Sequence, residues 1–272
     1  GDCKSSDLTD NDNGVVAWDE AVAFYTGSLE GVDGKGNGNL LYSLADKRCA
    51  NFGTCTGDVG NSNAISGTSA VNERVMNLFR EGQVNLHNGD CGHVEEVKGA
   101  IVDQMTIPLV QGTLRYLYKA DPKGANEGNK ARAELWAFAA AILPRVDKCD
   151  AGVATMLREN SYIGNDPMKD GFKTVKEALE KTYSCLGFKC SDVGGIVDGG
   201  AGQYVSGMEP CVDDQESSGG SGGLAEWAFV TIIVCAVLFC LGLCCTAFFF
   251  RSSRRYKAKF EQFKENGTMD TV

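Results

Sequence analysis

The chain has 272 residues, of which 36 are acidic and 26 basic, and its formal net charge is -10. With 43% hydrophobic and 23% charged residues it is too apolar for a disordered chain and does not fit collagen or a simple coiled coil. The acidic excess argues against a nucleic-acid partner, because phosphate binding needs a basic surface. The only histidines are His87 and His93, which excludes a histidine-rich metal site.

The first 198 residues predict a mainly α-helical body. After an N-terminal segment, 1–13, apolar residues recur near the 3.6-residue period of a helix. We predict helices at 16–29, 72–86, 93–118, 130–143 and 172–186. Stretches rich in Gly and Asn separate them, and Pro108 is expected to kink or split the central helix. No sustained alternation of apolar and polar residues predicts a sheet.

Three segments with other properties follow the body. Residues 199–224 are rich in Gly and Ser and predict a flexible stalk. The next segment, 225–250, includes an uncharged run at 227–250 that is long enough, at about 36 Å, to cross a bilayer core of about 30 Å as a helix. In the tail, 251–272, six basic residues outnumber three acidic ones. The positive-inside rule places this tail in the cytosol.

This order of segments predicts a type I single-pass protein of the plasma membrane, with the body outside the cell. The chain begins with Gly, which fits a removed signal peptide. Eight cysteines precede the predicted span, and an even number in an exported domain indicates disulfides: Cys3, Cys49, Cys55, Cys91, Cys149, Cys185, Cys190 and Cys211. Zinc is the weaker alternative, because the cysteine pairs are too widely spaced and no histidine pair accompanies them.

Two parts of the body also resemble each other in sequence. Ala23-Phe24 match Ala137-Phe138 at an offset of 114 residues, whereas Cys49 matches Cys149 at an offset of 100. One insertion of 14 residues in the first copy explains the change of offset. We therefore predict a duplicated, two-lobed domain with repeats at 14–118 and 119–198. If the disulfides follow the duplication, one bridge forms in each lobe, Cys49–Cys91 and Cys149–Cys190.

Oxygen-bearing side chains gather in two short runs of the first copy. Where the first copy has Tyr25, the second has Ala139, so a single functional site is expected in the first copy. Carboxylate and phenolate oxygens are hard ligands suited to ferric iron, and an arginine can hold a bridging anion. The candidate metal ligands are Asp19, Glu20, Tyr25, Tyr42 and Asp46, and the candidate anion partner is Arg48. From the spacing alone, a structural role as helix cap and core is the alternative.

The same two runs, WDEAVAFYTGSLEG (18–31) and LLYSLADKRCANFGTC (40–55), resemble the signature of the algal iron-assimilating proteins. These are the low-iron-inducible periplasmic proteins of green algae and the phytotransferrins of diatoms and related algae. The similarity covers roughly residues 14–198. It implies a surface protein that binds Fe(III) with carbonate as synergistic anion and serves high-affinity iron uptake. The membrane anchor resembles the endocytosed members, which implies endosomal vesicles and endocytic or reductase partners.

Two other classes of function are compatible with the sequence. One is a structural or adhesion ectodomain, and the other is an accessory subunit of a membrane complex without metal binding. No nucleophile elbow, zinc-protease motif or kinase signature is present, so we do not expect an enzyme. Neither signature run contains a histidine, which differs from the ligand set of the animal transferrins.

Overall fold

A computed structural model describes residues 14–27, 40–57, 65–166, 168–198 and 202–213 of the chain. In these residues the protein is mainly α-helical and contains no β-strand, as the hydrophobic periodicity predicts. The N-terminal segment 1–13, the predicted span at 225–250 and the tail at 251–272 lie outside the described residues. Within the described part, no helix is both long and apolar enough to cross a membrane.

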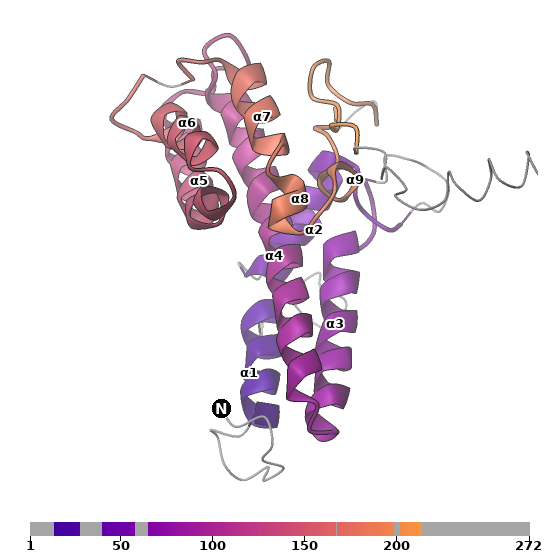
Figure 1. The fold of residues 1–272 in the computed structure, drawn as a ribbon. Helices are drawn as coiled ribbons and strands as arrows, with labels where there is room; N and C mark the ends of the chain where they lie inside the picture. Colours follow the sequence, from indigo (N-terminus) through magenta and orange to yellow (C-terminus); the bar gives the residue numbers. More distant parts are fainter. Residues whose placement is uncertain (1–13, 28–39, 58–64, 167, 199–201, 214–272) are drawn as a thin grey trace, which may run out of the picture. The chain divides into compact units, whose positions relative to one another are not determined.

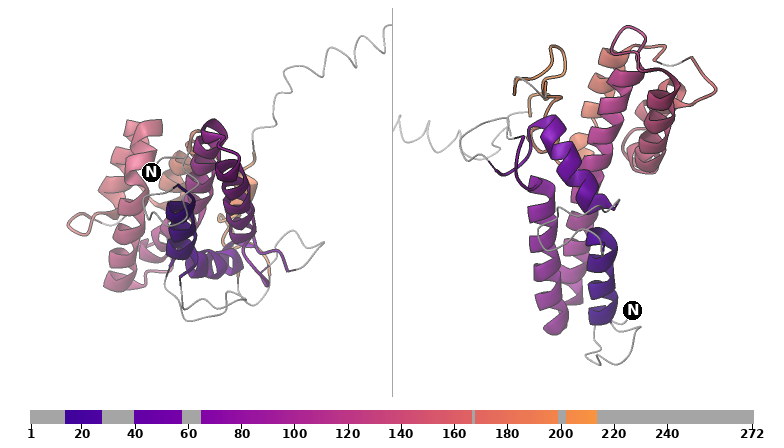
Figure 2. Two further views of the ribbon diagram at one scale, coloured as in Figure 1. Left: turned by 90° about the horizontal axis from the view of Figure 1, so that it is seen from below. Right: turned by 180° about the vertical axis from the view of Figure 1, so that it is seen from behind.

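The first four helices pack against one another along α4 (Figures 1 and 2). They are α1 (Gly14–Thr26), α2 (Leu41–Phe52), α3 (Ala70–His87) and α4 (Cys91–Ala120). Trp18 fixes α1 on α3, since its indole N–H donates to the carbonyl oxygen of Phe79 at 2.9 Å and its ring meets the Phe79 ring edge-on. The side chains of Ser69 and Asp90 accept backbone N–H bonds at the starts of α3 and α4, which explains where these helices begin.

The remaining helices pack on α4 or on one another. They are α5 (Gly128–Cys149), α6 (Ala151–Ser161), α7 (Phe172–Glu180), α8 (Tyr183–Leu186) and α9 (Cys190–Val193). The core that they share with α4 contains fully buried aliphatic side chains such as Leu117, Leu135, Ile142 and Leu157. The predicted helix at 172–186 is interrupted between α7 and α8, and the sequence reasoning missed α2, α6 and α9.

Both long helices continue through a proline. α4 is one helix across Pro108, so the split expected there does not occur. The neighbouring side chains of Ile107 and Val110 are fully buried, and their burial offsets the one backbone hydrogen bond that the proline removes. α5 likewise runs through Pro144 to Cys149, beyond the predicted end at residue 143.

The predicted disulfide bonding is confirmed, but the predicted pairing is wrong. Cys49 pairs with Cys55, Cys149 with Cys185, and Cys190 with Cys211. Cys91 is also disulfide-bonded, and Cys3 lies outside the described residues. Cys55 lies beside Ser69 at the start of α3, whereas Cys91 follows the other end of this 18-residue helix, about 27 Å away. A Cys49–Cys91 bridge is therefore geometrically impossible in this fold.

Part of the predicted stalk belongs to the body. Residues 202–213 fold back on the helices, and the compact unit ends at Asp213. The backbone N–H of Ile196 donates to the carbonyl oxygen of Met208, whose side chain is buried in the core. The Cys190–Cys211 disulfide holds the same segment against α9. Backbone hydrogen bonds and this disulfide thus hold 202–213 in place, although the composition of this stretch predicted a flexible linker.

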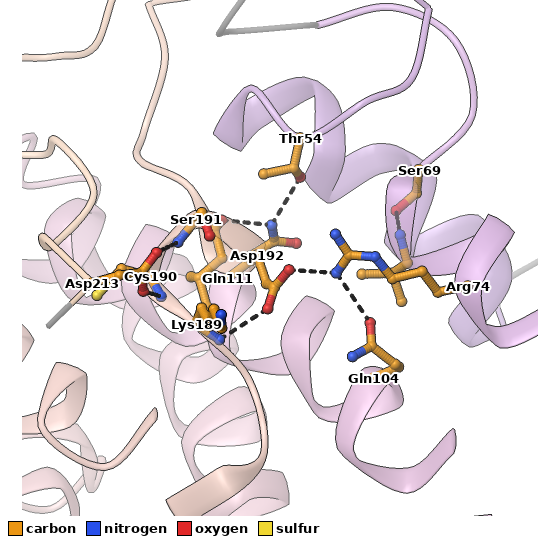
Figure 3. Close-up of polar contacts among 12 residues, drawn as sticks. Thr54, Ser69, Arg74, Gln104, Gln111, Lys189, Cys190, Ser191, Asp192 and Asp213 are labelled. Atoms are coloured by element: carbon orange, nitrogen blue, oxygen red, sulfur yellow. Dashed lines mark hydrogen bonds and ion pairs between the residues drawn. The ribbon is translucent and has the colours of Figure 1, made fainter. Parts of the chain in front are cut away.

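A polar junction connects α3, α4 and α9 (Figure 3). The buried amide of Gln111 on α4 donates to the hydroxyl of Thr54 at 3.2 Å and to the carbonyl oxygen of Val193 at 2.8 Å. Arg74 on α3 forms an ion pair with Asp192 on α9. Both carboxylate oxygens of Asp213 accept backbone N–H bonds at the start of α9, which keeps the end of the described chain in place.

Candidate functional site

Three of the predicted ligands come together between α1, α2 and α3. Tyr25, at the end of α1, is only 2% exposed, and its ring meets the Tyr42 ring of α2 nearly perpendicularly at 5.9 Å between centroids. Phe79 of α3 lies against the same tyrosine at 6.0 Å. Asp46 lies one helical turn after Tyr42 on α2 and faces the start of α3. The structure therefore juxtaposes Tyr25, Tyr42 and Asp46.

Asn72, which the sequence reasoning missed, connects these groups. The Tyr25 hydroxyl donates to Asn72 Oδ1 at 2.6 Å. The Nδ2 of Asn72 donates to Asp46 Oδ1 at 2.7 Å and to the backbone carbonyl oxygen of Tyr42 at 3.0 Å. The amide of Asn72 is fully buried, and its oxygen and both its N–H groups are hydrogen-bonded. We call Tyr25, Tyr42, Asp46 and Asn72 the oxygen cluster.

Burial disfavours the charged forms of two members of the oxygen cluster. It raises the pKa of Tyr25 well above its usual range, and the nearby Asp46 and Tyr42 raise this pKa further. Burial also raises the pKa of Asp46, against the opposing effect of hydrogen bonds from the Ser69 backbone N–H and from Asn72. A cation that binds here must displace the Tyr25 proton, so its binding will depend on pH.

Asp19 and Glu20 do not join the oxygen cluster. Both side chains are exposed on α1, whereas Tyr25, further along the same helix, is buried. At 100° per residue, a position six residues before Tyr25 lies far around the helix from it. Within the described residues, no three His, Cys, Asp or Glu side chains gather closely enough to hold a metal ion.

Arg48 faces the opposite side of α2 from Asp46. Its side chain is 9% exposed and lies among Arg115 and Tyr116 of α4 and Glu134 of α5. The structure thereby separates the predicted anion partner from the predicted metal ligands. We call Arg48, Arg115, Tyr116 and Glu134 the Arg48 cluster, and sequence reasoning found only Arg48 as a member of a site.

The charges of the Arg48 cluster are unequal. Burial lowers the pKa of Arg48, Arg115 lowers it further, and Tyr116 and Glu134 act in the other direction. Burial raises the pKa of Tyr116, as does its hydrogen bond with Glu134. The Tyr116 ring stacks on Phe138 of α5 at 5.6 Å between centroids, which fixes its position. Among the described residues that act on Arg48, one further guanidinium, of Arg115, and one carboxylate, of Glu134, carry charge.

Two cavities lie elsewhere in the described body. One, of about 710 Å³, opens between the end of α4, the start of α7 and the segment 206–210. A second, of about 400 Å³, lies between α3 and α4 and is lined by Arg74, Glu81 and Asp103. None of the predicted site residues lines either cavity.

Comparison with known proteins identifies no relative. No protein-family model, curated protein or solved structure matches the chain. The functional argument therefore depends on the residues of the chain itself.

Proposed function

We propose that this protein captures ferric iron at the cell surface for high-affinity uptake, with carbonate as the synergistic anion. The observation that carries this proposal is the convergence of a phenol, a carboxylate and an amide from three helices in the oxygen cluster. The resemblance of 18–31 and 40–55 to the algal iron-assimilating proteins supports it, because both runs contribute side chains to this cluster.

The chemistry of the oxygen cluster suits a hard trivalent cation. Fe(III) prefers anionic oxygen ligands, and the cluster offers the Tyr25 phenol, the Tyr42 phenol and the Asp46 carboxylate. Iron displaces the phenolic protons, and the Tyr25–Asn72 hydrogen bond breaks when the phenolate turns to the metal. Arg48 faces α4 and α5 and therefore does not hold the carbonate at this cluster. The carbonate would instead bind to the iron itself.

Release follows from the same groups. The pKa of Asp46 is raised, so this carboxylate takes up a proton at a higher pH than an ordinary aspartate. Acidification of a vesicle protonates Asp46, the carbonate and the tyrosinates, and the ion leaves. The predicted span at 225–250 and the cytosolic tail make such a vesicle the proposed destination of the protein.

We also propose that the body arose by an ancient duplication. The sequence matches at offsets of 114 and 100 residues support it, as does one pair of helix starts. α4 begins at Cys91 and α9 at Cys190, an offset of 99 residues. The insertion falls between α1 and α2, at the place where α5 continues without interruption.

Substitution of both tyrosines tests the proposed iron site. Tyr25→Phe combined with Tyr42→Phe keeps the ring packing and removes both phenol oxygens. This double variant should lose ferric affinity and the visible tyrosinate-to-iron absorption band in a titration with a soluble ferric chelate. Tyr162→Phe, at a half-exposed position on the C-terminal side of α6, is the matched control and should bind as the wild type does. Normal binding by the folded double variant would refute the site assignment.

A further inference from the structure

Arg48 is a buried cation with unused hydrogen-bond donors. The residue is 91% buried, and its Nε and Nη1 atoms have no hydrogen-bond partner among the described residues, although its guanidinium does hydrogen-bond with Tyr116. Proteins rarely leave buried donors unpaired, and an uncompensated buried charge is costlier still. Such an arginine lowers the stability of the fold unless a ligand that is not part of the protein chain pairs with its free donors.

The neighbours of Arg48 favour an anion as that ligand. Among the described residues that act on Arg48, Arg115 adds a second positive charge and Glu134 is the one carboxylate. Tyr116 interacts with both Arg48 and Glu134, so its hydroxyl lies among the charged groups. These groups come from α2, α4 and α5, whose packing holds them in place before any ligand arrives.

We propose that Arg48, Arg115 and Tyr116 form a binding site for a small oxyanion at the junction of α2, α4 and α5. Phosphate, sulfate and bicarbonate share the required chemistry, which is a compact anion with several acceptor oxygens for the guanidinium donors. The site lies on the other side of α2 from the oxygen cluster and fills without iron. The proposal therefore stands or falls independently of iron binding.

Glu134 gives the site a diagnostic response to mutation. Its carboxylate repels an anion, so Glu134→Gln should strengthen anion binding while leaving a polar partner for Tyr116. Arg115→Gln should weaken binding about tenfold, and Arg48→Gln should abolish it. A purely structural cluster responds differently, because loss of the Glu134 carboxylate would then destabilise the protein without strengthening anion binding.

The test uses the purified full chain, freed of metal by a chelator that is then removed, and inorganic phosphate or sodium bicarbonate as the probe. Calorimetric titration should show saturable binding, and the melting temperature should rise with probe concentration to a plateau. Arg74→Gln, which removes a half-exposed arginine of α3, is the control and should bind the probe normally. It also corrects for the general stabilising effect of phosphate on proteins.

Two results would overturn the proposal: no saturable binding of either probe to the wild type, or unchanged binding by Arg115→Gln together with weaker binding by Glu134→Gln. If Arg48→Gln does not fold, the Arg115→Gln and Glu134→Gln variants still test the proposed anion site. The Tyr25→Phe/Tyr42→Phe variant should keep its anion binding, which separates this site from the proposed iron site.

Discussion

At the scale of single residues, Asn72 makes the oxygen cluster one hydrogen-bonded unit. Its side chain accepts from Tyr25 and donates to Asp46 and to the backbone of Tyr42. Without it, the buried Tyr25 hydroxyl would lose its hydrogen bond to Asn72, and Asp46 and the Tyr42 carbonyl would each lose one hydrogen bond. The same amide orients the Tyr25 hydroxyl and the Asp46 carboxylate, which are the groups proposed to receive iron.

Asn72→Ala should therefore destabilise the protein markedly. Leaving buried polar groups unpaired costs about 1–3 kcal/mol, and we expect a loss of about 2–3 kcal/mol in the free energy of unfolding. Asn77→Ala, at an exposed position of the same helix, is the control and should change stability little. Urea unfolding of both variants measures the difference. Equal effects of the two substitutions would mean that the Asn72 hydrogen bonds contribute little.

Asp46 predicts a pH dependence of stability. Its pKa is higher in the folded than in the unfolded chain, so the folded state binds the proton more tightly. Protonation of Asp46 therefore adds to the stability of the fold at low pH, and this contribution is lost as the pH rises through the folded-state pKa. Asp46→Asn does not titrate, and its amide oxygen still accepts from Ser69 and Asn72. The stability of the variant relative to the wild type should thus increase between pH 4 and pH 7. A relative stability that falls over this range would reverse the assigned direction of the pKa shift.

The sequence predicted only part of the site, for identifiable reasons. Residue type and the signature runs pointed to Tyr25, Tyr42 and Asp46, which do meet. Asp19 and Glu20 share a run with Tyr25 but lie on another face of α1, which proximity in sequence does not reveal. Asn72 lies beside the buried Val71 on α3, and a polar residue at a core position was the available signal. Tyr116 and Glu134 reach Arg48 only through the packing of α4 and α5.

At the scale of helices, α4 organises the body because the other long helices pack on it. Helices above 15 residues were predicted well, since their apolar period repeats several times. The 12-residue α2 and 11-residue α6 are shorter, so their apolar period repeats fewer times, and α2 also lacks a side-chain cap at its start. The contact between α4 and α5 requires a residue without a side chain: a Cβ atom at Gly112 would lie 2.4 Å from the Phe138 ring.

Gly112→Ala should force α4 and α5 apart and cost about 1–3 kcal/mol, the range for overpacking in a core. The same substitution at Gly99, an exposed position of α4 with no atom near the added methyl group, should instead stabilise by about 0.5–1 kcal/mol. Thermal unfolding of the two variants tests the close approach. The opposite signs are the informative result, and stabilisation by both would contradict the packing of Phe138 on Gly112.

At the scale of the whole molecule, the disulfides constrain chain segments of very different length. Cys149–Cys185 closes 36 residues and Cys49–Cys55 only 6. Loop-closure entropy predicts about 4 kcal/mol of stabilisation for the first and about 2 kcal/mol for the second. Paired alanine substitutions, compared by urea unfolding, should show this order. If removal of the shorter loop cost more, the entropic account would fail for this protein.

The composition of the whole chain predicted the helical class and the disulfide bonding, because both depend on residue counts and periodicity. It did not predict that residues 202–213 join the body, because the backbone pairing of Ile196 with Met208 leaves no periodic signature in a Gly-rich stretch. The disulfide pairing failed for a related reason. The predicted pairing followed similarity of sequence between the two proposed copies, whereas the actual partners are set by where the helices end in space.

The central claim is that the full chain binds ferric iron through tyrosine oxygens and carbonate. Titration of the purified, metal-free protein with a soluble ferric chelate, with and without bicarbonate, tests it most directly. The account predicts saturable binding with a visible tyrosinate-to-iron band that requires bicarbonate and disappears on mild acidification. Absence of saturable binding, or binding without this band and indifferent to bicarbonate, would contradict it.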